Sequence, residues 1–78
     1  MPNEPQEWTP ERVLDERPSV KVRLLDRSVV EGSLARDGED FLSVWIPFAL
    51  VSARMVRVAT VSPVTVAYVL NNDVALSV

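Results

Sequence analysis

The chain contains neither cysteine nor histidine. Without cysteine it has no disulfide and no thiolate ligand for a metal. Without histidine it lacks both the commonest general base and the commonest metal ligand of proteins. Only two glycines are present, which excludes a glycine-rich phosphate loop. We therefore predict that the protein is not an enzyme, uses no cofactor, and has no catalytic, cofactor-binding or metal-binding residues.

Charge is scarce in the second half of the chain. The formal net charge is −3, but residues 41–78 carry only Arg54, Arg57 and Asp73. Pro47 and Pro63 interrupt this apolar half before any uncharged run reaches the roughly 18–20 residues that a membrane-spanning helix requires. The first residues lack the basic and apolar pattern of a secretory signal. We expect a cytoplasmic protein with no membrane partner.

A chain of 78 residues is one small domain with little core. We assign residues 1–8 to a flexible N-terminus and residues 9–78 to a single small β-barrel domain. Because disulfides and thiolate metal sites are excluded, oligomerisation is the remaining common way for so small a core to gain buried area.

The first predicted element is a short helix that ends by Glu16. Thr9 suits the N-cap and Pro10 the first helical position, and Glu11 complements the positive end of the helix dipole. Trp8 and Val13 have the spacing of a hydrophobic staple. Pro18 disfavours helical geometry at the residue before it, which ends the helix.

Three antiparallel strands follow, at residues 20–25, 29–36 and 41–46. The first two alternate apolar and polar residues, and residues 26–28 and 37–40 form the turns between the three strands. Gly32 lies within the second strand, where a strand of a small barrel bends sharply or allows another backbone to approach. Glu31 is predicted to lie across from Arg23.

The apolar half is predicted to add a strand at residues 55–61 and a hairpin of strands 64–70 and 74–78. Residues 71–73, Asn-Asn-Asp, form the hairpin turn. Both faces of this hairpin are apolar, so we expect it to pair with another chain. Residues 47–52 have three possible structures: a strand, a bulge or a single helical turn.

Residues 9–46 resemble the Sm-like family of small five-stranded barrels. The matching segments are residues 20–26, 30–34 and 37–42. The resemblance implies a mainly β fold, an Sm-like or SH3-like barrel of bent antiparallel strands with a short N-terminal helix, to which we add the C-terminal β-hairpin. RNA-binding members carry an Asn in the third-strand loop and an Arg-Gly pair before the last strand. Here Asp40 or Phe41 and the segment 47–49 occupy those places, so the usual RNA pocket is not visible.

The predicted function is that of a non-catalytic interaction or structural module that self-assembles through its apolar C-terminal half. Its partner is a second copy, with another protein as an alternative. The predicted oligomer interface consists of six residues of the hairpin: Val64, Val66, Tyr68, Leu70, Val74 and Leu76.

Two alternative functions remain open from the sequence. One is weak RNA binding, for which the basic candidates are Lys21, Arg23, Arg27 and Arg36. Negative net charge and interleaved acidic residues make RNA the less favoured partner, and DNA is not expected. The other is a small-ligand pocket between subunits, lined by Trp45, Phe48 and Met55.

Overall fold

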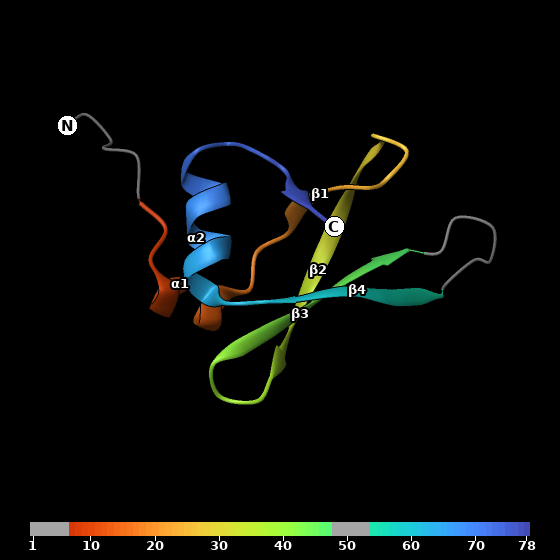
Figure 1. Ribbon diagram of the computed structural model, residues 1–78. Coiled ribbons are helices and arrows are strands. Elements are labelled where there is room, and N and C mark those ends of the chain that lie inside the picture. The colour runs from red at the N-terminus through yellow and green to blue at the C-terminus, as the bar shows by residue number, and fades with distance from the viewer. Residues whose placement is uncertain (1–6, 48–53) are drawn as a thin grey trace.

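A computed structural model describes residues 7–47 and 54–78. In this part of the chain a mainly β fold combines a five-stranded, strongly curled half-barrel sheet with two helices (Figure 1). In chain order the elements are α1 (Pro10–Glu16), β1 (Val20–Arg23), β2 (Val29–Asp37), β3 (Phe41–Pro47), β4 (Met55–Val61), α2 (Pro63–Asn71) and β5 (Leu76–Ser77). The sheet order is β4-β3-β2-β1-β5, and all neighbours are antiparallel except the parallel pair β1 and β5.

Helix α1 forms as its sequence predicts. The hydroxyl of Thr9 accepts a hydrogen bond from the backbone N–H of Arg12 at 3.2 Å, and Pro10 occupies the first turn. Arg17 ends the helix in the left-handed region, with φ of 47°, one residue before Pro18. The N-cap and the proline stop are therefore both confirmed.

Strands β1 to β3 also lie within or close to the three segments predicted for them. Val20 and Val22 point into the core while Lys21 and Arg23 are exposed. The prediction that Glu31 lies across from Arg23 was wrong, however. Glu31 lies opposite Lys21, and Arg23 lies opposite Val29. Strand β1 ends at Arg23, two residues earlier than predicted, and the N–H of Leu24 donates to the oxygen of Ser28. The turn therefore lies at residues 25–27, one residue earlier than predicted, and this shifts the register.

Gly32 allows three strands to pack closely. An added Cβ would lie 2.8 Å from Cγ2 of Val22, 3.1 Å from Cγ1 of Val44 and 3.5 Å from the backbone oxygen of Trp45. Close packing at this glycine is therefore present, but valine side chains of β1 and β3, and not another backbone as predicted, make the closest contacts. Gly38, in the β2–β3 turn, has φ of 74° and open space around it, so only its backbone conformation requires glycine.

Strand β4 contains a bulge that the sequence did not reveal. Val44 pairs with Ala59 but Trp45 pairs with Arg57, which leaves Val58 as an extra residue. The bulge interrupts the alternation of side chains along β4. Ala59 faces the core opposite Val44, whereas beyond the bulge Val56 takes the position opposite Ile46.

The predicted C-terminal hairpin was wrong, because residues 63–71 form helix α2. Its start repeats the signals of α1: the Ser62 hydroxyl accepts from the N–H of Thr65 at 3.2 Å, and Pro63 follows. The helix buries Pro63, Val66, Ala67 and Val69. Val66 and Ala67 follow Pro63 by three and four residues, a spacing that suits a helix better than a strand.

The segment predicted as a hairpin turn is instead the end of α2. Asn72 caps the helix and Asp73 turns the chain with φ of 52°. The chain then reaches β5, a two-residue strand parallel to β1, with Val22 beside Leu76. The crossover through α2 brings β5 alongside β1 in the same direction. The sheet is therefore not purely antiparallel.

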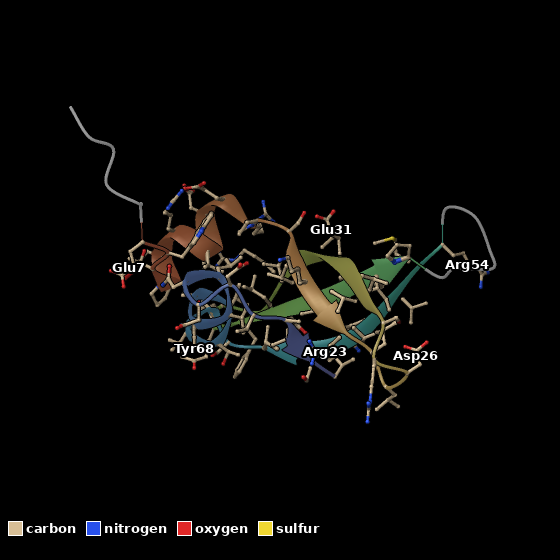
Figure 2. The ribbon with its side chains drawn as sticks, turned by 90° about the horizontal axis from the view of Figure 1, so that it is seen from above. Glu7, Arg23, Asp26, Glu31, Arg54 and Tyr68 are labelled. Carbon is tan, nitrogen blue, oxygen red and sulfur yellow. The ribbon has the colours of Figure 1, made fainter. Side chains whose placement is uncertain are left out.

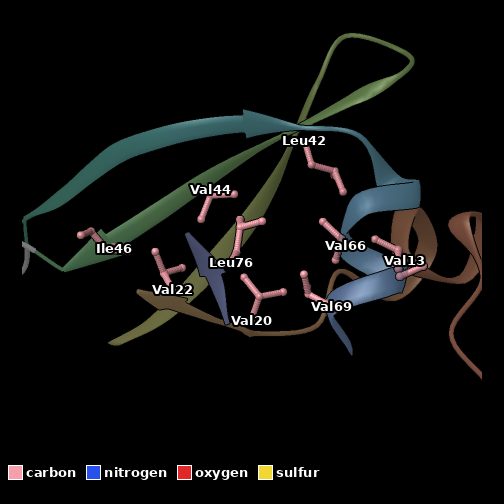
Figure 3. Close-up of a cluster of buried hydrophobic side chains, with 10 residues drawn as sticks. Val13, Val20, Val22, Leu42, Val44, Ile46, Val66, Val69 and Leu76 are labelled. Carbon is pink, nitrogen blue, oxygen red and sulfur yellow. The ribbon is translucent and has the colours of Figure 1, made fainter. Parts of the chain in front are cut away.

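The core lies between the inner face of the half-barrel and α2 (Figure 3). Its buried hydrophobic residues are Val13, Val20, Val22, Leu42, Val44, Ile46, Val66, Ala67, Val69 and Leu76. The two helices lie side by side at one end of the sheet, so they cover one opening of the half-barrel (Figure 1).

The segment before α1 is tied to the end of α2. The backbone N–H of Trp8 donates to Oδ1 of Asn71 at 2.7 Å, and Nδ2 of Asn71 donates back to the Trp8 oxygen at 2.8 Å. The Arg12 guanidinium lies 3.9 Å from the centre of the Trp8 ring. Trp8, assigned above to the flexible N-terminus, thus belongs to the folded domain.

Two predictions fall outside the described residues. These are the flexibility of residues 1–6 and the structure of residues 48–52, although Pro47 itself is the last residue of β3. Neither helix among residues 7–47 and 54–78 has the length and apolar character needed to cross a bilayer.

Candidate interaction surface

The four basic residues predicted for RNA contact do not form one strip. Lys21 and Arg23 share the outer face of β1, and Arg27 lies in the turn that follows. Arg36 lies near the far end of β2, beside Arg17 and the acidic residues of α1, around a shallow cavity of about 380 Å³.

Acidic groups also offset the basic residues on β1. Nζ of Lys21 lies 3.3 Å from Oδ1 of Asp73, and Glu31 is its cross-strand neighbour. Lys21, Arg23 and Asp73 border a cavity of about 540 Å³ on the outer side of β1 and β5. Such a mixed surface lacks the continuous positive charge that a nucleic-acid backbone requires.

The structure divides the predicted oligomer interface in two. Val66 and Leu76 are only 0% and 7% exposed and belong to the core of the chain itself, so their assignment to an interface was wrong. Leu70 is half-buried. Val64, Tyr68 and Val74 remain exposed, the first two by 63% each. The cause is the helix: a strand would place residues 64, 66 and 68 on one face, whereas α2 separates residue 66 from the other two.

Most of the large apolar side chains on the surface come from the charge-poor half of the chain. Those exposed in the described residues are Leu25, Val29, Phe41, Met55, Val56, Val64, Tyr68, Val74 and Val78. All but the first two belong to residues 41–78, which carry only three charges. Val64 and Tyr68 belong to α2, Met55 and Val56 to the edge strand β4, and Phe41 is the first residue of β3. Val74 lies between α2 and β5, and Val78 follows β5.

The open side of the half-barrel holds an apolar cavity of about 530 Å³. Its walls are Leu24, Leu25 and Asp26 from the end of β1 and the turn, Val58 from β4, and Val78. The N–H of Val78 donates to the backbone oxygen of Arg23 at 3.3 Å, which holds that wall in place. Val58 reaches the cavity from the bulge in β4.

Sequence reasoning missed this cavity, although one signal was present. Leu24 and Leu25 are consecutive, so they cannot both follow the apolar face of β1. The structure half-buries Leu24 and leaves Leu25 92% exposed. Two adjacent leucines at a strand end thus indicate an apolar residue directed outward.

Asp26, at the rim of this cavity, holds the β1–β2 turn together. Its Oδ1 accepts from the Ser28 hydroxyl at 2.6 Å and from the Ser28 N–H at 3.0 Å. These bonds, the hydroxyl first, lower the pKa of the Asp26 carboxyl below its ordinary value of 3.8. Figure 2 places Asp26 at the same end of the molecule as Arg54.

We expect Ser28→Ala to destabilise the chain slightly, and in a pH-dependent way. Because the pKa of Asp26 is lower in the folded chain, its stabilising contribution is complete above the unfolded value and disappears as the pH falls through the folded value. The urea midpoint of Ser28→Ala should therefore be lower than that of the wild type near neutral pH. The gap should shrink below about pH 4. An equal gap at all pH values would contradict this origin.

The remaining predicted pocket is only partly described. Trp45 and Met55 lie on the neighbouring strands β3 and β4, with Met55 opposite Pro47, and Phe48 lies outside the described residues. Over residues 7–47 and 54–78, no group of three acidic side chains is placed to hold a metal ion.

Comparisons of the chain with protein-family models, with curated proteins and with solved structures gave no significant match.

Proposed function

We propose that the protein is a non-catalytic module that self-assembles through its apolar surfaces. The observation that supports this proposal is that residues 41–78 combine many exposed apolar side chains with only three charged residues. Depletion of charged residues and enrichment in apolar and aromatic ones are typical of the centre of a protein interface. Large apolar patches on a surface commonly mark such sites.

A second copy of the chain is the partner that best fits this surface. The core is small, so burial between subunits adds stability that one copy lacks. Strand β4 is at the edge of the sheet, and an edge strand with apolar residues such as Met55 and Val56 is an aggregation hazard unless it is covered. A closed oligomer covers it in every subunit.

The resemblance to Sm-like barrels refines this proposal without deciding the number of subunits. The N-terminal helix, the curled sheet and the glycine at its tightest point fit that resemblance. Helix α2 and the parallel β5 differ from the antiparallel barrel expected from it. A closed ring in solution would favour the Sm-like reading, and a dimer would favour a different assembly.

The solution mass of the purified chain tests the proposal. Light scattering coupled to size exclusion, at tens of micromolar protein, should give a stable multiple of the 8.7 kDa chain mass. Because the contact is apolar, the mass should change little when the salt concentration is raised, unlike that of an assembly held by surface charges. A clean monomer over this range would contradict the proposal.

A further inference from the structure

We infer that two copies of the chain pair through the first half of β4, antiparallel to each other and about a twofold axis at Val56. This inference rests on the proposed self-assembly and adds the surface, the symmetry and the register of the contact. The surface is the edge segment, defined as Met55, Val56 and Arg57, which belongs to the charge-poor half of the chain.

The backbone of the edge segment is open to a further strand. β4 is the last strand at one end of the sheet, and within the described part of the chain it pairs with β3 alone. Its free edge therefore presents backbone N–H and C=O groups to whatever lies beside it. An extended strand satisfies such donors and acceptors together, which makes a strand the occupant that this edge specifies.

The side chains of the edge segment are incompletely covered on both faces of the sheet. Val56 faces inward, opposite the buried Ile46, yet it is 39% exposed. Met55, opposite Pro47 on the other face, is 44% exposed, and Arg57 is exposed as well. A strand added beside β4 would cover Val56 on the inner face and Met55 on the outer face.

Charge selects a neutral, apolar strand as the partner. The Arg57 guanidinium lies 3.6 Å from Oδ2 of Asp37 in its own chain, so its charge is already offset and does not require an acidic strand. Between Met55 and Val61, β4 carries no acidic residue and no charge other than Arg57. A second β4 therefore matches the edge segment in both charge and apolar character.

Strand lengths select a twofold contact over a head-to-tail one. The sheet ends in β4 on one side and in β5 on the other, and β5 has only two residues. Pairing β4 with the β5 of another copy would leave most of the seven-residue edge of β4 uncovered. Pairing β4 with β4 covers two equal edges at once, as the same patch on both subunits of a twofold dimer does.

The bulge limits where the axis lies. Val58 is the extra residue that interrupts β4, and beyond it Ala59 and Val61 are half-buried, so the continuous exposed run is the edge segment. With Val56 opposite Val56 of the second copy, Met55 lies opposite Arg57. This register keeps the two Arg57 side chains out of direct opposition, where like charges are destabilising.

The first test measures the register by cross-linking the full chain, which has no cysteine of its own. Under mild oxidation, Val56→Cys should form a disulfide-linked dimer, because its side chains face each other across the axis. Met55→Cys and Arg57→Cys chains, one carrying a size tag, should form a mixed disulfide much faster than either chain forms one with itself. Val64→Cys, exposed on α2, is the matched control and should cross-link slowly.

The second test changes the charge at one position. In this register Met55→Lys sets two lysines opposite the two Arg57 side chains, whereas Met55→Glu sets two glutamates there. The dissociation constant of Met55→Lys should exceed that of Met55→Glu about ten-fold, and the gap should shrink at high salt. Far-UV circular dichroism of both variants should match the wild type, since residue 55 is exposed in the single chain.

The outcomes separate the two proposals. An oligomer whose Met55→Cys and Arg57→Cys chains show no preference for each other, and whose two charge variants dissociate alike, would overturn the β4 contact and leave self-assembly standing. Faster cross-linking through Val64→Cys would do the same and assign the contact to α2. A monomeric wild type would overturn both.

Discussion

Val66→Asp should leave the chain unfolded at room temperature. Val66 is fully buried between α2 and the sheet, near Leu42 and Val69 (Figure 3). Burying an unpaired carboxylate costs several kcal/mol, and the apolar contacts of the valine are lost as well. A chain of 78 residues has a total stability of roughly 4–12 kcal/mol. The substitution therefore removes most or all of it.

The matched control is Val64→Asp, two residues away on the same helix. Valine and aspartate have similar helix propensities, so the two substitutions differ mainly in burial. Val64 is 63% exposed and lies in the first turn of α2, where a negative charge is favourable. Circular dichroism and urea unfolding should show Val64→Asp folded with near wild-type stability. Equal loss in both variants would contradict the orientation of α2.

Substituting Gly32 should have the second largest effect. In Gly32→Ala the new Cβ would lie 2.8 Å from Cγ2 of Val22, closer than real contacts of this kind. Val22 is fully buried and cannot swing away, so the strands must separate. We expect a loss of about 1–3 kcal/mol for Gly32→Ala and a larger loss for Gly32→Val, measured by urea unfolding.

A double-mutant cycle with Val22→Ala tests the stated cause. Removing Cγ2 of Val22 makes room for the new methyl, so the double variant should be more stable than the sum of the two single losses predicts. Simple additivity would show that the clash is not the origin. Gly38→Ala is the contrasting case: nothing lies within 4 Å, and its cost of roughly 1–2 kcal/mol comes from its φ of 74° alone.

Local signals predicted the first half of the fold well. The Thr-Pro start of α1, the alternation of β1 and β2 and the Asp-Gly turn each act over a few residues, so a single sequence is enough to recognise them. The same kind of signal was present at Ser62-Pro63, but the valines, threonine and tyrosine that follow favour strands. Burial of Val66 and Val69 against the sheet overrides that preference, and burial is a tertiary effect.

The candidate contact surface was less accessible to sequence analysis. The bulge at Val58 depends on how β4 pairs with β3, and the cavity depends on how far the sheet curls. Neither is encoded in a short motif. The apolar excess of residues 41–78 was visible, but it did not show which apolar residues the chain would bury itself.

The contacts between the two ends of the described chain have a consequence for the order of folding. The hairpins of β1 to β4 join neighbouring segments, whereas the Trp8–Asn71 bonds span 63 positions and β5 must return to β1. Closing a loop over such a sequence separation costs chain entropy before any stabilising contact forms, and this slows folding. During synthesis the hairpins can therefore form while the edge of β1 that pairs with β5 is still unpaired. A nascent chain in that state exposes the unpaired backbone edge of β1 and its inward-facing valines, Val20 and Val22, to neighbouring chains. Chaperone demand and inclusion-body formation should therefore depend on how quickly α2 and β5 form.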